Sequence, residues 1–258
     1  MIWVHINCYN GHMIWVHIKS IFSFRFYHRL AFATRGQMIA FGIYLFMLSL
    51  VVFYFFAGSY IDKNLPVLLK NFPEVTFEKG VLTAPKNAVS VTVPDSDVKL
   101  VFDASRTTPP TQADMVKEQI LMLVSGNKLY MPAANGVQSR ELPPQLTFVT
   151  SQDNLAKQKD SLASALMVMA CLSALVAIPL VMLFGFCVAG AVGMFFKLLT
   201  RSALPRKIIF KWAFFMLGPL SALWYARLYW NIPLFTFAQI ILCLIYMQQI
   251  FNTLPEEK

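Results

Sequence analysis

The chain has 258 residues, of which 57% are hydrophobic and only 14% are charged, a balance too apolar for an ordinary soluble domain. The formal net charge of +9 invites comparison with nucleic-acid-binding proteins. The excess basic residues flank apolar stretches and form no stripe on a folded domain, so we expect no nucleic-acid partner.

The N-terminal segment, residues 1–36, contains one hexapeptide twice, Met1–Ile6 and Met13–Ile18. This duplication is too short for a repeat array, and it leaves open whether translation starts at Met1, at Met13 or later. Residues 14–32 combine aromatic and basic side chains, a composition typical of an amphipathic helix at the inner membrane interface. A secretory signal is the alternative, but the apolar stretch that follows is too long for one.

Four residues near the N-terminus resemble a metal-binding set, because His and Cys at short spacing can ligate zinc. They are His5, Cys8, His12 and His17. Their spacing matches no structural zinc pattern, and two of the histidines come from the duplicated hexapeptide. We therefore predict no metal site and no cofactor.

Residues 37–58 form the first predicted transmembrane helix, with no charged residue inside it. The second apolar stretch, residues 161–199, is nearly twice as long as one crossing needs. One interpretation is a single long helix bent at Pro179, and the other is a two-crossing hairpin about Gly185. We favour the single helix, because a hairpin would place the basic residues that follow on the same side as the domain.

Two more spans, residues 208–226 and 232–251, complete a helical membrane bundle over residues 161–251, and residues 252–258 form a tail. Four crossings put both termini on the inner, cytoplasmic side and mark a multi-pass membrane protein. The basic residues agree with this orientation, since cytoplasmic segments are enriched in Lys and Arg and attract anionic lipids. They are Lys19, Arg25, Arg29, Arg35, Lys197, Arg201, Arg206, Lys207 and Lys211.

Residues 59–160 differ in composition, with near-equal numbers of basic and acidic residues and several β-branched runs bounded by turn residues. Strands are predicted within residues 74–83, at 89–93 and 98–103, and as a hairpin over 120–131, with a short helical turn at 114–119. The predicted fold class is an α+β membrane protein. Its four transmembrane helices carry a small, mainly antiparallel β extracytoplasmic domain inserted between the first and second.

This domain has neither cysteine nor histidine, which excludes a disulfide framework and Ser-His-Asp or Cys-His catalysis within it. Its densest carboxylates are Asp95, Asp97 and Asp103. Paired carboxylates can act as acid and base or bind Ca²⁺, so these three are weak ligand-site candidates. A turn role is the stronger interpretation for Asp95 and Asp97, which follow Pro94.

Weakly polar exceptions in the predicted span interiors include Ser164, Ser173, Ser221 and Gln239. Ion-coupled transporters usually hold ionisable groups there, so a self-contained transporter is the less favoured hypothesis. Gly185, Ala189 and Gly193 recur every four residues, a spacing that allows close helix packing in lipid. They predict packing within the chain or, less strongly, against a partner.

Three short stretches, Phe77–Leu82, Leu100–Asp103 and Gly126–Tyr130, resemble a bacterial family of uncharacterised multi-span membrane proteins. Some members of that family are named as maltodextrin-utilisation accessory proteins. The resemblance extends over about residues 26–251 and implies a location in the bacterial cytoplasmic (inner) membrane, with a hint of sugar uptake. It transfers no catalytic residue.

We expect a non-enzymatic accessory protein that contacts the lipid bilayer and a membrane protein partner such as a transporter. The first alternative is a self-contained transporter or channel with a water-filled path lined by Ser164, Ser173 and Gln239. The second is an envelope enzyme that uses carboxylates such as Asp95, Asp97 or Asp103.

Overall fold

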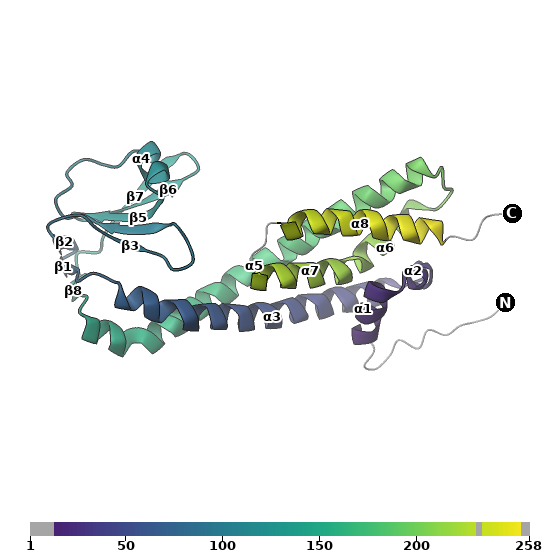
Figure 1. Cartoon of the computed structure of the whole chain (residues 1–258), viewed down its shortest axis with the longest axis horizontal. Coiled ribbons are helices and arrows are strands. Elements are labelled where there is room, and N and C mark those ends of the chain that lie inside the picture. Colours follow the sequence, from purple (N-terminus) through teal and green to yellow (C-terminus); the bar gives the residue numbers. More distant parts are fainter. Residues whose placement is uncertain (1–12, 231–233, 254–258) are drawn as a thin grey trace. The chain divides into compact units, whose positions relative to one another are not determined.

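The computed structural model describes residues 13–230 and 234–253 (Figure 1). The chain divides into two compact units. We call Met1–Phe56 with Met169–Lys258 the helical unit, and Ala57–Val168 the β unit. Two helices, α3 (Arg35–Lys70) and α5 (Gln152–Leu199), contribute residues to both units, so the predicted domain limits at residues 59 and 160 fall inside helices.

The N-terminal segment contains two helices where the composition predicts one. They are α1 (Met13–Phe22) and α2 (Phe24–Leu30), separated at Ser23. The backbone of Ser23 is extended, and serine is a preferred residue before a new helix. Tyr27 is fully buried, and its hydroxyl donates a hydrogen bond to the Ser20 carbonyl (3.1 Å), which fixes α2 against α1.

Three helices of the described chain are long and apolar enough to cross a membrane: α3, α5, and the pair α6 (Arg206–Phe215) and α7 (Leu217–Trp230) taken together. Residues 161–199 lie within the single helix α5, which is one of the two predicted alternatives. The last helix, α8 (Leu234–Asn252), has a shorter apolar stretch in its described part, Phe237–Asn252.

The predicted span over residues 208–226 is broken at Met216, between α6 and α7. Pro219 explains the break, because it has no backbone N–H to donate to the carbonyl four residues earlier. Proline is best tolerated in the first turn of a helix, and α7 begins two residues before Pro219, whereas α3 and α5 continue through Pro66 and Pro179.

The core of the helical unit surrounds α6, whose Trp212 is almost completely buried. The Trp212 indole donates a hydrogen bond to the Tyr27 carbonyl (2.7 Å) and packs edge-on against His28 and Phe251. In the most apolar 18-residue stretch of α6–α7, 50% is buried inside the protein, whereas only 11% of the corresponding stretch of α5 is buried. The α6–α7 pair is therefore the centre of the bundle, and α5 is exposed along most of its length.

The β unit contains two small sheets. The first has the order β2-β1-β8, all antiparallel, from β1 (Thr76–Glu78), β2 (Val81–Ala84) and β8 (Phe148–Val149). The second has the order β3-β4-β5-β6-β7. Its strands are β3 (Val89–Thr92), β4 (Lys99–Phe102), β5 (Ile120–Ser125), β6 (Lys128–Ala133) and β7 (Gly136–Glu141).

The second sheet is mixed and not purely antiparallel, because β4 and β5 run parallel. Parallel neighbours need a crossover connection, and here it carries the short helix α4 (Gln112–Lys117). The predicted hairpin of residues 120–131 is present as β5–β6, and the predicted pair within residues 74–83 is present as β1–β2. Gly80 in the β1–β2 turn has φ +79°, and a Cβ there would lie 2.6 Å from the Pro143 carbonyl oxygen.

Candidate functional site

The three candidate carboxylates lie in turns of the β unit. Asp95 sits in the turn between β3 and β4, in the left-handed backbone region with φ +57°. A backbone hydrogen bond from Val93 N–H to the Val98 carbonyl closes this turn (2.8 Å). Asp97 lies in the same turn, whereas Asp103 follows β4.

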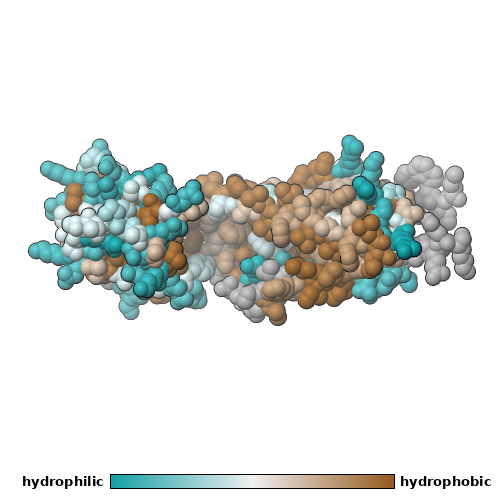
Figure 2. All heavy atoms as spheres, turned by 90° about the horizontal axis from the view of Figure 1, so that it is seen from above, coloured by the Kyte–Doolittle hydropathy of each residue, from teal (hydrophilic) through white to brown (hydrophobic). Residues whose placement is uncertain are grey.

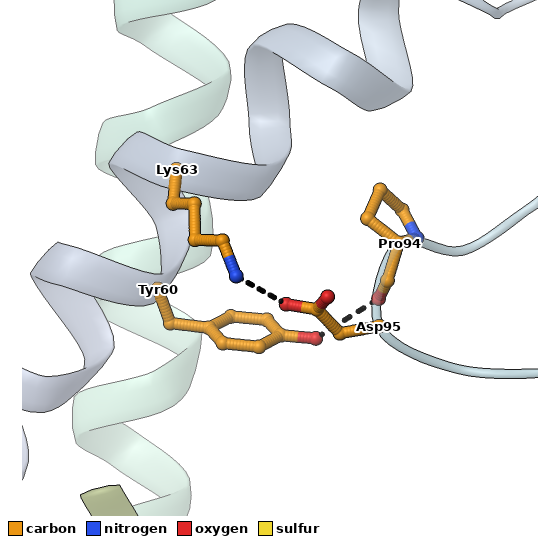
Figure 3. A network of polar contacts seen from close by, with 4 residues as sticks. All are labelled: Tyr60, Lys63, Pro94 and Asp95. Atoms are coloured by element: carbon orange, nitrogen blue, oxygen red, sulfur yellow. Dashed lines mark hydrogen bonds and ion pairs between the residues drawn. The ribbon is translucent and has the colours of Figure 1, made fainter.

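Asp95 pairs with the part of α3 that belongs to the β unit (Figure 3). Lys63 Nζ lies 3.0 Å from Asp95 Oδ2, and the Tyr60 hydroxyl donates a hydrogen bond to the Pro94 carbonyl (3.3 Å). The hydrogen bond and the positive charge of Lys63 lower the pKa of Asp95 below its ordinary value. Asp95 therefore holds the β3–β4 turn against α3 as a carboxylate.

Asp103 has a different role from Asp95. Its Oδ1 accepts hydrogen bonds from the Ser105 backbone N–H (3.0 Å) and the Ser105 hydroxyl (2.7 Å). This is the short-range pattern by which an aspartate stabilises its own turn. Each of the two carboxylates is thus engaged locally, and within the described residues no three His, Cys, Asp or Glu side chains form a metal-binding group.

The N-terminal metal-like set can be placed only in part. His5, Cys8 and His12 lie outside the described residues, and His17 is buried in α1. Burial lowers the pKa of His17. The ring packs edge-on against Phe41 and Tyr44 of α3, so it serves as a neutral packing residue.

The described residues of the helical unit include no aspartate and no glutamate, so the charged side chains among them are all Lys or Arg. The cations gather where α2, the start of α3 and the start of α6 meet. Figure 2 shows hydrophilic residues at this end of the unit, beyond a broad hydrophobic band. Lys211 Nζ donates to the Ala31 carbonyl (2.8 Å) and Lys197 Nζ to the Leu204 carbonyl (2.6 Å). None of the described residues of the helical unit carries a carboxylate that could neutralise these cations.

The small residues of α5 face other helices of the same chain. A Cβ on Gly185 would lie 3.3 Å from Leu217, and one on Gly193 would lie 2.6 Å from Ile209 and 3.1 Å from Met247. Ala189, between them, is fully buried. These three residues therefore let α6, α7 and α8 approach α5 closely.

The weakly polar residues of the helices have separate surroundings. Ser164 and Ser173 are exposed, and the Ser173 hydroxyl is bonded to carbonyls of its own helix. Ser221 and Gln239 line an apolar cavity in the helical unit, together with Ser49 and Trp224. Sequence reasoning singled out neither Ser49 nor Trp224. A serine inside an apolar stretch was a signal for Ser49, but a tryptophan in a predicted span gives none.

The sequence model of one protein family matches residues 17–251, a range that includes both units. The family is described as "Protein of unknown function (DUF1189)". No curated protein and no solved structure matches the chain.

Proposed function

The chain belongs to the DUF1189 family, whose description assigns no activity, and we propose that it is a non-enzymatic accessory protein of the bacterial inner membrane. It crosses the bilayer four times, through α3, α5, α6–α7 and α8. Both termini lie in the cytoplasm and the β unit lies outside. Its partner is another membrane protein of an envelope or transport complex. In its most specific form, the proposal is that this complex takes up sugar.

The length of α5 carries this proposal. At 1.5 Å per residue its apolar part, residues 161–199, extends about 58 Å, whereas the hydrocarbon core is about 30 Å thick. Transmembrane helices tilt by up to about 40°, which would still leave about 45 Å along the membrane normal. Apolar surface must then lie beyond the hydrocarbon, where it is unfavourable unless protein covers it.

The chain itself leaves this surface open. Only 11% of the most apolar 18-residue stretch of α5 is buried. Near the start of its apolar part, four large side chains are exposed: Leu166, Val168, Met169 and Leu172. The small residues of α5 are already used inside the chain, as Gly193 shows by its contact with Ile209 and Met247. A partner helix would therefore pack on the larger exposed side chains near the start of the apolar part.

The alternative hypotheses lack a comparable observation. A channel through this chain would need a polar path, but Ser173 is exposed and bonded to its own helix. An enzyme based on carboxylates would need free groups, but Asp95 is paired with Lys63 and Asp103 with Ser105. We therefore propose neither.

The test is cross-linking in the native host at native expression. A photoreactive amino acid replaces Met169 of α5, and a matched variant carries it at the exposed Val116 of α4. After mild-detergent purification, we expect a discrete adduct of Met169 with one other membrane protein, present in near-equal amount, and none from Val116. A protein that purifies alone, with cross-links only to lipid or to a second copy, would overturn the accessory role.

A further inference from the structure

The helical unit contains a cavity of about 150 Å³ between α3, α5, α7 and α8. Its walls are mostly apolar, with Leu45, Val181, Leu220 and Ile240 among them. A mostly apolar cavity of this size can hold a benzene-sized molecule. The cavity is thus suited to an apolar occupant.

Two polar side chains of the wall have no hydrogen-bond partner among the residues that the structure describes. They are Trp224 of α7, whose indole N–H is a donor, and Gln239 of α8, whose amide has both donors and an acceptor. The two hydroxyls of the wall are satisfied. Ser49 bonds to the Leu45 carbonyl (2.7 Å) and the Tyr225 hydroxyl (2.9 Å), and Ser221 donates to the Gly218 carbonyl (2.7 Å).

These features together select the chemistry of the occupant. Leaving polar groups unpaired in an apolar environment is unfavourable, so the occupant should offer a hydrogen-bond acceptor next to an apolar chain. Trp224 lies in the next-to-last turn of α7 and Gln239 in the second turn of α8. Both are within about 10 Å of those helix ends, a depth that a lipid ester group can approach from the same leaflet.

We propose that the cavity binds the segment of one acyl chain next to the ester group of a bilayer phospholipid, and that the ester carbonyl accepts a hydrogen bond from Trp224 or Gln239. This inference rests on the proposed membrane insertion of the helical unit. The walls belong to four helices, so a bound chain would link α3 and α5 to the α7–α8 pair. The bound lipid is then a structural component of the bundle.

The probe is phosphatidylglycerol with a diazirine in one acyl chain, added to vesicles that contain the full-length protein. We expect saturable labelling of Leu220 and Cys243, which line the cavity but are almost inaccessible from outside the chain. Val181→Trp fills the cavity and should reduce this labelling at least tenfold. Val176→Trp adds the same ring to an exposed site of the same helix and should leave it unchanged.

Two further variants distinguish the contribution of acyl-chain packing to lipid binding from that of the hydrogen bond. Ile240→Trp fills the cavity from α8, in case Val181→Trp does not fold. Gln239→Leu keeps the cavity but removes the amide, and we expect about five- to tenfold weaker competition by unlabelled lipid. Gln248→Leu, at an exposed site of α8, is its matched control and should have no effect.

Labelling confined to exposed residues such as Val176, not saturable and unchanged by Val181→Trp, would overturn the lipid site. So would a cavity that exchanges with bulk water in folded protein. Carbonate extraction of the same vesicles tests the premise separately. A protein released by carbonate is not membrane-inserted, and then the proposed function fails before the cavity is probed.

Discussion

The two units place their apolar residues in opposite ways. In the β unit, residues such as Val75, Phe77 and Leu123 are buried between or beneath the sheets, and charges of both signs lie outside. In the helical unit, long rows of apolar side chains on α3 and α5 are exposed, and no carboxylate is present among the described residues. The same exposed fraction of an apolar side chain therefore has a different meaning in each unit. We interpret it as contact with water in the β unit and with lipid in the helical unit.

The strongest test of this difference between the units compares two valines with equal exposed fractions. Val176 of α5 and Val116 of α4 are each 64% exposed. Val176→Lys should cost about 2.5–3.5 kcal/mol, because a charged side chain near the centre of a transmembrane helix is expensive. Val116→Lys faces water and should change stability by less than about 0.5 kcal/mol. The measurement is the membrane-inserted fraction of the full chain, followed by its thermal stability in detergent.

Equal effects of the two lysines would contradict the two-solvent interpretation. If neither substitution lowers the membrane-inserted fraction or the thermal stability, α5 is solvated by water in the native protein. If both reduce stability alike, Val116 is covered by protein. Val176→Leu is the control for loss of the valine side chain itself, and it should leave insertion unchanged because leucine is at least as apolar.

The sequence predicted the apolar helices of the chain because a long uncharged stretch has few alternatives. It did not predict how far these helices continue beyond the apolar stretches. Polar residues such as Asp62 and Lys63 look like an exit from the membrane, yet α3 continues through them to Lys70 as a helix outside the apolar stretch. Polarity reports the solvent and not the end of a helix, so the predicted limits at residues 59 and 160 lie inside α3 and α5.

The β unit was predictable where a strand pair is local. The turn at Gly126 and the one at Gly80 each join neighbouring strands, and both pairs were found. The sequence did not show β8, because it is only two residues long and pairs with β1 from far along the chain. The parallel β4–β5 pair was missed for the same reason, since its register depends on the crossover through α4.

Candidate sites were harder to predict than elements. The carboxylates drew attention because of their sequence density, but Asp95 and Asp103 have separate partners. The cavity is formed by four helices, and of its lining residues the sequence analysis singled out only Gly185, Ser221 and Gln239. A wall assembled from residues far apart in the chain leaves no local pattern, so Trp224 gave no signal in the sequence.

A second prediction concerns the buried polar contacts of the β unit. Thr150 is almost fully buried, and its Oγ1 accepts a hydrogen bond from the Val75 N–H (2.5 Å) while donating one to the Pro73 carbonyl (2.9 Å). Thr150→Val keeps the shape but leaves the Val75 N–H unpaired, which should cost about 1–3 kcal/mol. Hydrogen exchange of β1 in the full-length protein measures this loss without requiring the whole chain to unfold in one step.

The control for Thr150 is Thr147, three residues earlier and exposed. Its Oγ1 accepts a long hydrogen bond from the Lys79 N–H (3.4 Å), close to water that can replace it. Thr147→Val should therefore change exchange by less than about 0.5 kcal/mol. A loss of protection confined to β1 and β8, with the helical unit unchanged, would show that the two units lose stability independently.

The smallest expected effect is that of the exposed Lys63–Asp95 pair, which joins the β3–β4 turn to α3. Because Lys63 lowers the pKa of Asp95 in the folded state, the pair stabilises the turn above the ordinary aspartate pKa. That stabilisation disappears as the pH falls through the lowered value. Asp95→Asn should speed hydrogen exchange of Ser96 and Val98 slightly at pH 7, and high salt should reduce the difference from wild type. As the pH falls below 3.8, the two proteins should converge. A difference that persists there would mean that asparagine disturbs the left-handed turn itself, and not that an ion pair is lost.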